Sequence, residues 1–581
     1  MCGIFGVIGT FEGSIKKPLE IIAHRGPDDS GLYSSKNVKL GFRRLSIIDL
    51  SPKGHQPMSN NNESVWIIFN GEIYNFQELR KKLLHKYRFR SGSDTEVLIH
   101  GYEEWGIDGL LKRINGMYAF CLLDKKKETV FLVRDRIGKK PLYYYTGTKF
   151  TAFSSEVKAF FELSNFNKEI DEEMFSIWMG FPYLPDNTKT ILKKVFKVPP
   201  GSYLKIKGGQ HDVVQYWSVP EPQDNLRDDS ARKLEALLTD SVHRRLIADV
   251  PVGILLSGGL DSSLIAALAT KGSAKKLNTI NISFPGSGID ESEYAEQVAS
   301  HLHTNHTTLR LKTDDIYSEF KKKIDIYDDL STTDSGLFST YLLAKSIRQQ
   351  GIRVALVGEG ADEIFGGYSW FSFAQFPFNI APSFLKSTFY YYAIMRQLST
   401  NSLKYINYLN EKLNESSGSF LKKIQCFEIM HSLPNHYCMK VDKGTMAASI
   451  EARAPYMDYR VVEAARNLSM NDLKGGHMFS PGGSYEKFIL RTIARKYLPN
   501  NIVDRKKKGG MMPVYSLLEK GIKKERNLIL NNPYLESFFS KNKLSALIDS
   551  SPKLPFLRWH REWILWKSLL FSLWAKNYNL I

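Results

Sequence analysis

The sequence predicts an α/β protein of two domains, and three observations support this prediction. Of the 581 residues, 43% are hydrophobic and 24% are charged, which is typical of a globular protein with large cores. Residues 1 to about 210 contain short apolar strands separated by Gly, Asn and Asp, whereas the later sequence alternates helices with apolar strands. Between these blocks, the polar and proline-containing stretch 219–230 predicts a linker.

In the first block, strands are predicted where apolar residues alternate or run together. These runs are 65–69, 118–123 and 130–133. Helices are predicted between them, around 76–84 and 95–105.

In the second block, strands are predicted at 252–256, 278–284 and 353–357. Because helical segments separate them, we expect a parallel sheet with helices on both faces. After about residue 365 the chain is predicted to be mostly helical. At its end, Trp559, Trp563, Trp566 and Leu570 recur at helical spacing, and the stretch is too short for a membrane span, so a buried terminal helix is expected.

Composition excludes several classes of protein. The four cysteines form no zinc or disulfide spacing, which favours a reducing cytoplasm, and no signal peptide is recognisable at the start. The formal charge of +18 is spread along the chain. Its one dense basic run, 505–508, is typical of a solvated loop, so we expect neither nucleic acid nor a membrane as a partner.

Cysteine follows the initiator methionine directly. Removal of Met1 would leave Cys2 with both a thiol and a free α-amine, and an α-amine titrates near pH ~8, so it can serve as a general base beside the sulfur. Such a residue can attack a carboxamide and pass through a thioester. A cysteine at this position also occurs by chance, so the pattern needs support from elsewhere in the chain.

A second chemical pattern lies at 257–263, Ser-Gly-Gly-Leu-Asp-Ser-Ser, between a predicted strand and a predicted helix. Gly258 and Gly259 let backbone N–H groups close around phosphate oxygens, and the helix N-terminus favours an anion. Asp261 can hold Mg²⁺. No Gly-Lys-Ser/Thr follows, so this is not a Walker A loop, and the alternative is a serine-capped turn. Hydroxyl donors to phosphate would come from Ser257, Ser262 and Ser263.

Further motifs accompany these two. In the first block they are 24–28 (HRGPD), 44–49 (RLSIID), 70–75 (NGEIYN), 93–96 (SDTE), 134–138 (RDRIG) and 154–156 (SSE). In the second block they are 358–363 (GEGADE), 449–455 (SIEARAP) and 486–491 (EKFILR). Taken with Cys2 and the 257–263 loop, they resemble the glutamine-hydrolysing asparagine synthetase family over nearly the whole chain.

The resemblance implies a fold for each block. Residues 1–212 would form a type 2 glutamine amidotransferase domain, an αββα sandwich of the N-terminal-nucleophile hydrolase kind. Residues 225–581 would form a parallel α/β ATP-pyrophosphatase domain with helical additions.

The resemblance also implies roles in the first domain. Cys2 would be the nucleophile, with Asn70 and the N–H of Gly71 as its oxyanion hole. Arg44 would bind the α-carboxylate of glutamine and Asp94 its α-ammonium group. The alternatives are a surface arginine at 44, a helix N-cap at 94 and a hairpin turn at 70–71. The glutamine pocket would be completed by Leu45, Ser46, Ile47, Ile48 and Glu72.

In the second domain, the resemblance implies that Glu359 assists formation or aminolysis of an acyl-adenylate and that Lys487 stabilises the departing phosphates. A surface ion pair is the alternative for Lys487. Asp261 and Asp362 would hold Mg²⁺. The position occupied by Val357 is serine in the family, so a hydroxyl contact is lost. ATP would be bound by Leu256, Ser257, Gly258, Gly259, Asp261, Ser262, Ser263, Ile282, Val357 and Gly358.

The expected activity is therefore ATP-dependent amidation of a carboxylate, with ammonia carried internally from Cys2 and with AMP and pyrophosphate released. The expected acceptor is L-aspartate, in a pocket near 327–341. Thr332-Thr333 lacks the following arginine of some asparagine synthetases, and 334–341 resembles a bacterial branch that also modifies glycans. Arg453 is either a replacement cation or a structural ion-pair partner. The alternative acceptor is a sugar uronic acid or a secondary-metabolite acid. A remote alternative function is that of an inactive binding protein.

The resemblance implies small-molecule substrates as partners and is compatible with a homodimer. The intact Cys2, Asn70, Asp94, Asp261 and Lys487 argue against the inactive binding protein.

Overall fold

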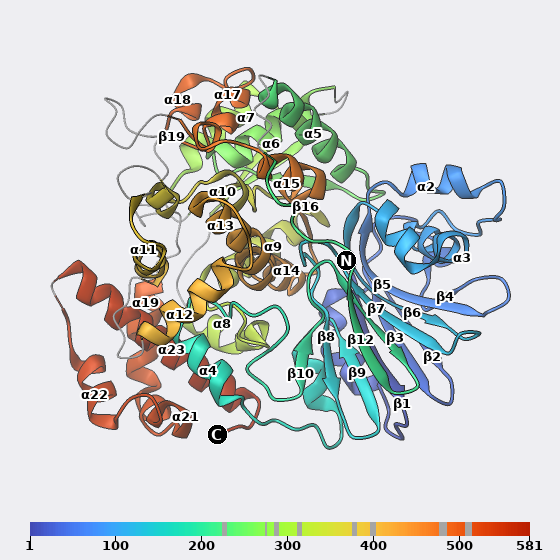
Figure 1. Ribbon diagram of the computed structural model, residues 1–581, viewed down its shortest axis with the longest axis horizontal. Helices are drawn as coiled ribbons and strands as arrows, with labels where there is room; N and C mark the ends of the chain where they lie inside the picture. Colours follow the sequence, from blue (N-terminus) through green and yellow to red (C-terminus); the bar gives the residue numbers. More distant parts are fainter. Residues whose placement is uncertain are drawn as a thin grey trace.

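The computed structural model describes residues 1–223, 229–272, 276–283, 290–310, 316–374, 380–395, 402–475, 485–505, 514–552 and 554–581. Figure 1 shows the two predicted blocks as two bodies side by side, and the N-terminus lies where they meet. The predicted linker and the basic run 505–508 fall partly outside the described residues.

The N-terminal body contains two antiparallel sheets. The first has the spatial order β10 (Val195–Lys197), β8 (Tyr143–Thr146), β9 (Phe150–Ser154), β1 (Gly3–Gly9), β3 (Val38–Arg44) and β2 (Asp29–Ser34). The second has the order β12 (Gln210–Gln215), β11 (Ser202–Lys207), β7 (Thr129–Arg134), β6 (Gly116–Asp124), β5 (Val65–Ile73) and β4 (Met58–Ser59). The runs predicted as strands at 65–69, 118–123 and 130–133 lie in β5, β6 and β7.

Alternation of apolar residues explains how these sheets pack. Ile4, Leu40 and Phe42 of the first sheet meet Ile68 and Leu132 of the second in a buried core between them. Helix α1 (Lys16–Ile21) packs outside the first sheet, and α3 (Asp94–Arg113) packs outside the second beside α2 (Phe76–Leu83). The domain is thus the predicted αββα sandwich. A fourth helix, α4 (Glu172–Gly180), precedes β10 and begins at an Asp171 cap.

The C-terminal body is built on a parallel sheet, as predicted. Its order is β15 (Asn305–Arg310), β14 (Asn278–Ser283), β13 (Val252–Leu255), β16 (Val354–Leu356) and β17 (Glu451–Arg453), and every neighbouring pair is parallel. A two-stranded ribbon, β18 (Lys474–Gly475) and β19 (Tyr485–Glu486), lies apart from it.

Apolar side chains cover both faces of this sheet. Ile254 and Leu356 pack on one face in the cluster that contains α6 (Leu260–Thr270), and Ile280 and Ala355 pack on the other with α9 (Gly336–Gln349). The other α-helices described in this domain before residue 450 are α5 (Ser230–Arg245), α7 (Ser292–His301), α8 (Ile316–Lys322), α10 (Ala361–Phe365), α11 (Ser383–Met395), α12 (Ser402–Leu413), α13 (Phe420–Phe427) and α14 (Cys438–Met446).

The last part of the chain is helical, as predicted. Its helices are α15 (Tyr459–Arg466), α16 (Met470–Leu473), α17 (Phe488–Ala494), α18 (Asn500–Val503), α19 (Val514–Lys524), α20 (Arg526–Leu530), α21 (Pro533–Glu536), α22 (Lys541–Asp549) and α23 (Pro555–Asn577). The C-terminal part of α23 is buried, so the expectation of a buried terminal helix is confirmed there.

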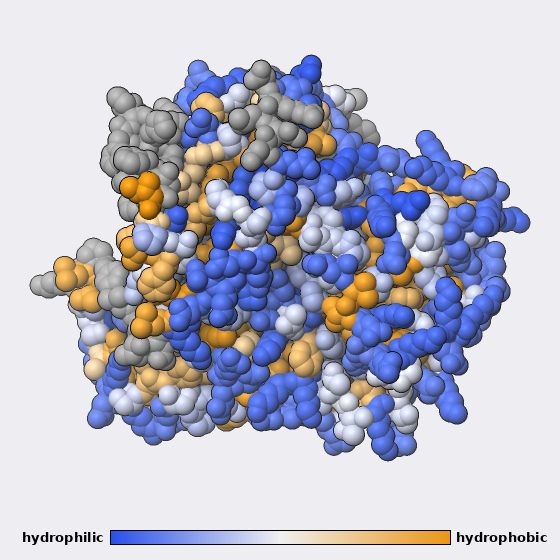
Figure 2. Space-filling view, viewed as in Figure 1, coloured by the Kyte–Doolittle hydropathy of each residue, from blue (hydrophilic) through white to orange (hydrophobic). Residues whose placement is uncertain are grey.

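The face seen in Figure 2 is mostly hydrophilic over both bodies. Apolar side chains gather on its left side, over α11, where Phe384, Leu385 and Phe389 are exposed. In the described part of the chain, none of the helices combines the length and the apolar character needed to cross a membrane.

Candidate active sites

Cys2 lies just before β1, at the boundary between the two bodies, and is only 8% exposed. Its backbone N–H donates to Asn70 Oδ1 at 3.0 Å, and its carbonyl accepts from Arg25 Nε at 3.2 Å. Burial raises the pKa of its thiol, while the nearby N-terminal ammonium group opposes that shift. A base close to the sulfur is therefore needed to form the thiolate.

Met1 occupies part of the cavity beside Cys2. Its ammonium group forms an ion pair with Glu451 of β17 at 2.9 Å, and its side chain packs against Leu45, Ile47 and Met117. Loss of Met1 would expose the α-amine of Cys2 and vacate this space. The cavity would then extend along apolar side chains toward the C-terminal body.

Opposite charges line the same cavity. Arg44 is 6% exposed and donates to the carbonyls of Asp49 and Ser51, so the alternative of an ordinary surface arginine is wrong. Asp94 accepts from the backbone N–H of Ile73 at 2.9 Å, and burial raises its pKa to about 6. Ser93, not Asp94, caps α3, so the N-cap alternative is displaced by one residue. A carboxylate and an ammonium group of one amino acid could meet this pair.

Asn70 and Gly71 lie inside strand β5, opposite Ala119 and Tyr118 of β6. The hairpin-turn alternative is therefore wrong, because long-range strand pairing overrides the local turn signal. Among the residues that the structure describes, Asn70 Nδ2 has no hydrogen-bond partner and is buried. A Cβ on Gly71 would lie 2.1 Å from the carbonyl oxygen of Met117, which only glycine avoids. Beside Cys2 there is thus one buried amide donor that protein atoms do not use.

The other predicted glutamine-pocket residues divide into two groups. Leu45, Ile47, Ile48 and Glu72 line the cavity. Ser46 does not line it, and its backbone N–H donates to Asp28. Six further residues line the cavity without having been assigned to it from the sequence. Ser93, Thr95 and Glu451 belong to motifs named above, whereas Gly54, Gln56 and Phe69 carry no local signal of a binding role.

The 257–263 loop connects β13 to α6. Ser262 Oγ accepts from the backbone N–H of Ser257 at 3.1 Å and lies 3.0 Å from Ser257 Oγ, so the two serines hold the loop closed. Gly258 has φ +70°, and a Cβ there would lie 2.6 Å from the backbone of Tyr294 and Ala295. This glycine is required both by its dihedral angle and by close packing.

Lys487 joins the loop to two carboxylates from different elements. Its Nζ lies 2.5 Å from Asp261 Oδ2 and 2.7 Å from Asp362 Oδ1, and the residue is 4% exposed. Burial lowers its pKa, but the two carboxylates outweigh burial and hold it above the usual value, so the ammonium stays charged. The alternative of a surface ion pair is therefore wrong. A cavity beside them is lined by Ser257, Gly259, Leu260, Asp261, Glu291, Glu486, Lys487, Arg491, Ile502 and Arg505.

Several predicted ATP-site residues do not line this cavity. Ser263 is fully buried in α6, and Leu256 is buried after β13. Gly358 lies against the start of α6, where an added Cβ would be 3.2 Å from the backbone nitrogen of Ser262. The others outside the lining are Gly258, Ser262, Ile282 and Val357.

Glu359 follows Gly358 and meets a cation that sequence reasoning missed. Lys440 Nζ of α14 lies 3.0 Å from Glu359 and 3.9 Å from Asp334. Asp334 belongs to the segment predicted near the acceptor. Arg453 is not available there: it is fully buried and paired with Glu451 at 2.6 Å and Glu72 at 3.2 Å, so it is the structural ion-pair partner.

The chain therefore joins two domains, each with a candidate site. The first is an αββα sandwich with Cys2 just before β1, and the second is a parallel α/β domain with a glycine-serine loop at the N-terminus of α6.

Comparison with known proteins gives the family. Residues 1–217 match the glutamine amidotransferase domain and residues 233–576 match asparagine synthase. The chain is 31% identical to asparagine synthetase [glutamine-hydrolyzing] 1 of Bacillus subtilis, over 99% of this chain and 96% of that protein. It is 31% identical to asparagine synthetase B of Escherichia coli, over 87% of this chain and 81% of that protein. The chain belongs to the asparagine synthase family, whose synthetase domain uses ATP, and it is an enzyme of the glutamine-hydrolysing class.

Proposed function

We propose that this protein converts L-aspartate to L-asparagine, with glutamine as nitrogen donor, through an acyl-adenylate that releases AMP and pyrophosphate. The main support for this proposal is that one chain contains both candidate sites. Arg44 and Asp94 lie beside Cys2 in the first. In the second, Lys487 lies between Asp261 and Asp362. The first pair suits the two charged groups of an amino acid. The second suits a polyphosphate that needs both positive charge and a metal-binding carboxylate.

In the glutaminase half, the α-amine of processed Cys2 would take the thiol proton and the sulfur would attack the carboxamide. Asn70 Nδ2, buried and without a protein partner in the described structure, would donate to the oxyanion, with the N–H of Gly71 as second donor. Ammonia leaves as the thioester forms, and water then releases glutamate. The space now filled by Met1 would open toward the C-terminal body and keep ammonia out of solvent.

In the synthetase half, the loop and the N-terminus of α6 would bind the phosphates of ATP. Lys487 would neutralise charge on the departing pyrophosphate. Asp261 and Asp362 supply the oxygen donors that Mg²⁺ prefers, and the described residues contain no cluster of three or more metal-ligand side chains, so phosphate oxygens would complete the coordination. When bound there, Mg²⁺ would neutralise phosphate charge. Glu359 would assist formation or aminolysis of the acyl-adenylate.

Lys440 would be the acceptor-binding cation. It lies between Glu359 and Asp334. Burial lowers the pKa of Lys440, but these carboxylates outweigh burial and hold that pKa above its usual value, so the ammonium stays charged. Its positive charge would replace the arginine that is absent after Thr332-Thr333. Arg453 does not provide this charge, because it is buried elsewhere. The segment beginning at Asp334 favours a uronic acid as the second candidate, since it resembles the branch that also modifies glycans.

Pyrophosphate release decides between these acceptors. The purified protein, given glutamine, ATP and Mg²⁺, is assayed with L-aspartate and separately with a panel of uronic acids. We expect release that depends on L-aspartate and formation of asparagine. Release with a uronic acid and none with aspartate would overturn the asparagine proposal.

A further inference from the structure

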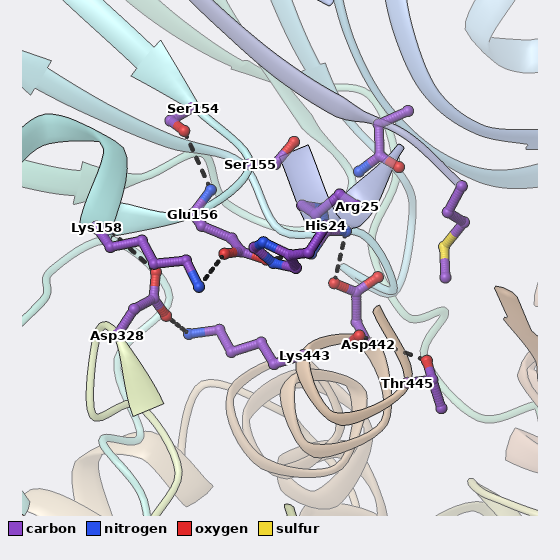
Figure 3. A network of polar contacts seen from close by, with 12 residues as sticks. His24, Arg25, Ser154, Ser155, Glu156, Lys158, Asp328, Asp442, Lys443 and Thr445 are labelled. Carbon is purple, nitrogen blue, oxygen red and sulfur yellow. Dashed lines mark hydrogen bonds and ion pairs between the residues drawn. The ribbon is translucent and has the colours of Figure 1, made fainter. Parts of the chain in front are cut away.

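A buried network of charged side chains joins the two domains beside Cys2 (Figure 3). Arg25, Glu156 and Lys158 come from the glutaminase domain, and Asp442 and Lys443 come from α14 of the synthetase domain. All five are nearly inaccessible to solvent. Buried charges of this kind are costly unless each has a partner, so the network fixes the relative position of the groups that it joins.

Arg25 is the member that touches the nucleophile. Its Nε donates to the carbonyl of Cys2 at 3.2 Å, and its NH1 donates to Glu156 at 2.8 Å. Its NH2 forms an ion pair with Asp442 at 2.8 Å, across the domain boundary. The guanidinium is therefore held from three directions, and one of those contacts determines where the backbone of Cys2 lies.

In the described part of the chain, the ion-pair partners of Asp442 both come from the glutaminase domain. Besides Arg25, Lys140 Nζ lies 3.3 Å from its Oδ1. Because Asp442 is a residue of α14, this helix is linked to the backbone of Cys2 through one side chain, Arg25. In Figure 3, Asp442 points from the helix toward Arg25.

The same helix is tied to the acceptor side of the synthetase domain by two lysines. Lys440 lies 3.0 Å from Glu359 and 3.9 Å from Asp334. Lys443 lies 2.5 Å from Asp328 and also pairs with Asp329, six and five residues before Asp334. A change in the charge balance around Lys440 acts on the helix that also carries Asp442.

We propose that α14 couples the two reactions: Asp442 positions Cys2 through Arg25, and binding of a carboxylate acceptor at Lys440 shifts the helix and with it the Cys2 backbone. Asp442 and Arg25 are positioning residues in this scheme. The inference rests on the proposed acceptor site at Lys440, and it adds that glutamine hydrolysis responds to the filling of that site.

The test measures glutaminase kcat and KM without and with ATP and acceptor, and the ratio of glutamate to amide formed. In the unaltered protein we expect stimulation of about fivefold or more, as is typical for coupled sites. In Asp442→Asn, we expect stimulation to be lost and glutamate to exceed amide, whereas synthesis from ammonium salts persists. Arg25→Lys, which keeps the charge but loses the Nε donor, is expected to act similarly.

Asp325→Asn is the matched control. It removes another cross-domain ion pair, Lys158–Asp325 at 3.0 Å, but does not touch Arg25 or α14. We expect stimulation to survive in it. Equal loss in Asp325→Asn, or full stimulation in both Asp442→Asn and Arg25→Lys, would overturn the inference. Amide synthesis without any stimulation in the unaltered protein would overturn it too, while leaving the proposed function intact. If pyrophosphate release instead requires a uronic acid, that acid replaces aspartate in the same assay.

Discussion

The two candidate sites differ in the charges that surround their key side chains, Cys2 and Lys487. At Cys2, the thiol faces the backbone carbonyl of Leu45, and burial raises the pKa of the thiol. At the phosphate loop, the ammonium group of Lys487 lies between two carboxylates, which hold its pKa above the usual value despite burial. The first arrangement suits release of neutral ammonia, and the second suits a highly charged anion. The comparison implies that damage to one site leaves the other chemically intact.

Loss of Asp261 is the strongest test of this separation. We expect Asp261→Asn to reduce amide synthesis more than about a thousandfold with either glutamine or ammonium salts, because the amide lacks the negative charge that pairs with Lys487 and that would hold the phosphate-bound metal. Glutamine hydrolysis without acceptor should stay within about twofold of the unaltered protein. A large loss of that hydrolysis would contradict the separation.

Cys2→Ala is expected to have an effect as large but confined to one nitrogen source. Glutamine-dependent synthesis should fall by more than about a thousandfold, since Cys2 is the only thiol among the described residues that line the cavity. Synthesis from ammonium salts should persist, because the adenylating site is separate. The two rates, measured side by side on one preparation, check this, and retained glutaminase activity would refute the role of Cys2.

Asn70→Ala should have a smaller effect. Removal of one oxyanion donor lowers kcat by about 10²–10³-fold, and we expect this loss in glutamine hydrolysis with little change in KM. Steady-state glutamine hydrolysis gives both constants. A rise in KM at constant kcat would assign Asn70 to substrate binding instead.

The smallest expected effect is a change in how glutamine hydrolysis depends on pH. Burial raises the pKa of Asp94 to about 6, so its carboxylate is ionised above that pH and protonated below it. Because we assign it to the α-ammonium group of glutamine, kcat/KM for glutamine should fall about tenfold per pH unit below the pKa. In Asp94→Asn we expect a low value without that inflection. The same inflection in the variant would place the titrating group elsewhere.

Local patterns predict elements of the fold, whereas contacts between distant chain segments carry no local signal. The apolar runs 65–69, 118–123 and 130–133 lie in β5, β6 and β7, and the 257–263 loop joins β13 to α6, as expected. Asn70-Gly71 has a strong turn signal, yet pairing along all of β5 and β6 places it inside a strand. Lys440 reaches Glu359 from a helix 81 positions later in the chain, and no local pattern predicts that meeting.

Domain contacts were equally hidden from the sequence. The pairing of Met1 with Glu451, and of Arg25 with Asp442, joins residues more than 400 positions apart. The sequence leaves two roles open for Arg453, a cation that binds the acceptor and a structural ion-pair partner. Its burial between Glu451 and Glu72 identifies it as the ion-pair partner. Long-range ion pairs of this kind depend on how the two domains meet.

The central claim is that a carboxylate acceptor is activated by AMP and then receives ammonia. L-Aspartate labelled with ¹⁸O in its side-chain carboxylate, incubated with the protein, ATP, Mg²⁺ and glutamine, tests it directly by mass spectrometry of the nucleotide product. We expect one ¹⁸O atom in AMP for each asparagine formed, because the acyl–oxygen bond breaks when ammonia attacks. Unlabelled AMP, or ADP and labelled phosphate instead, would contradict the acyl-adenylate.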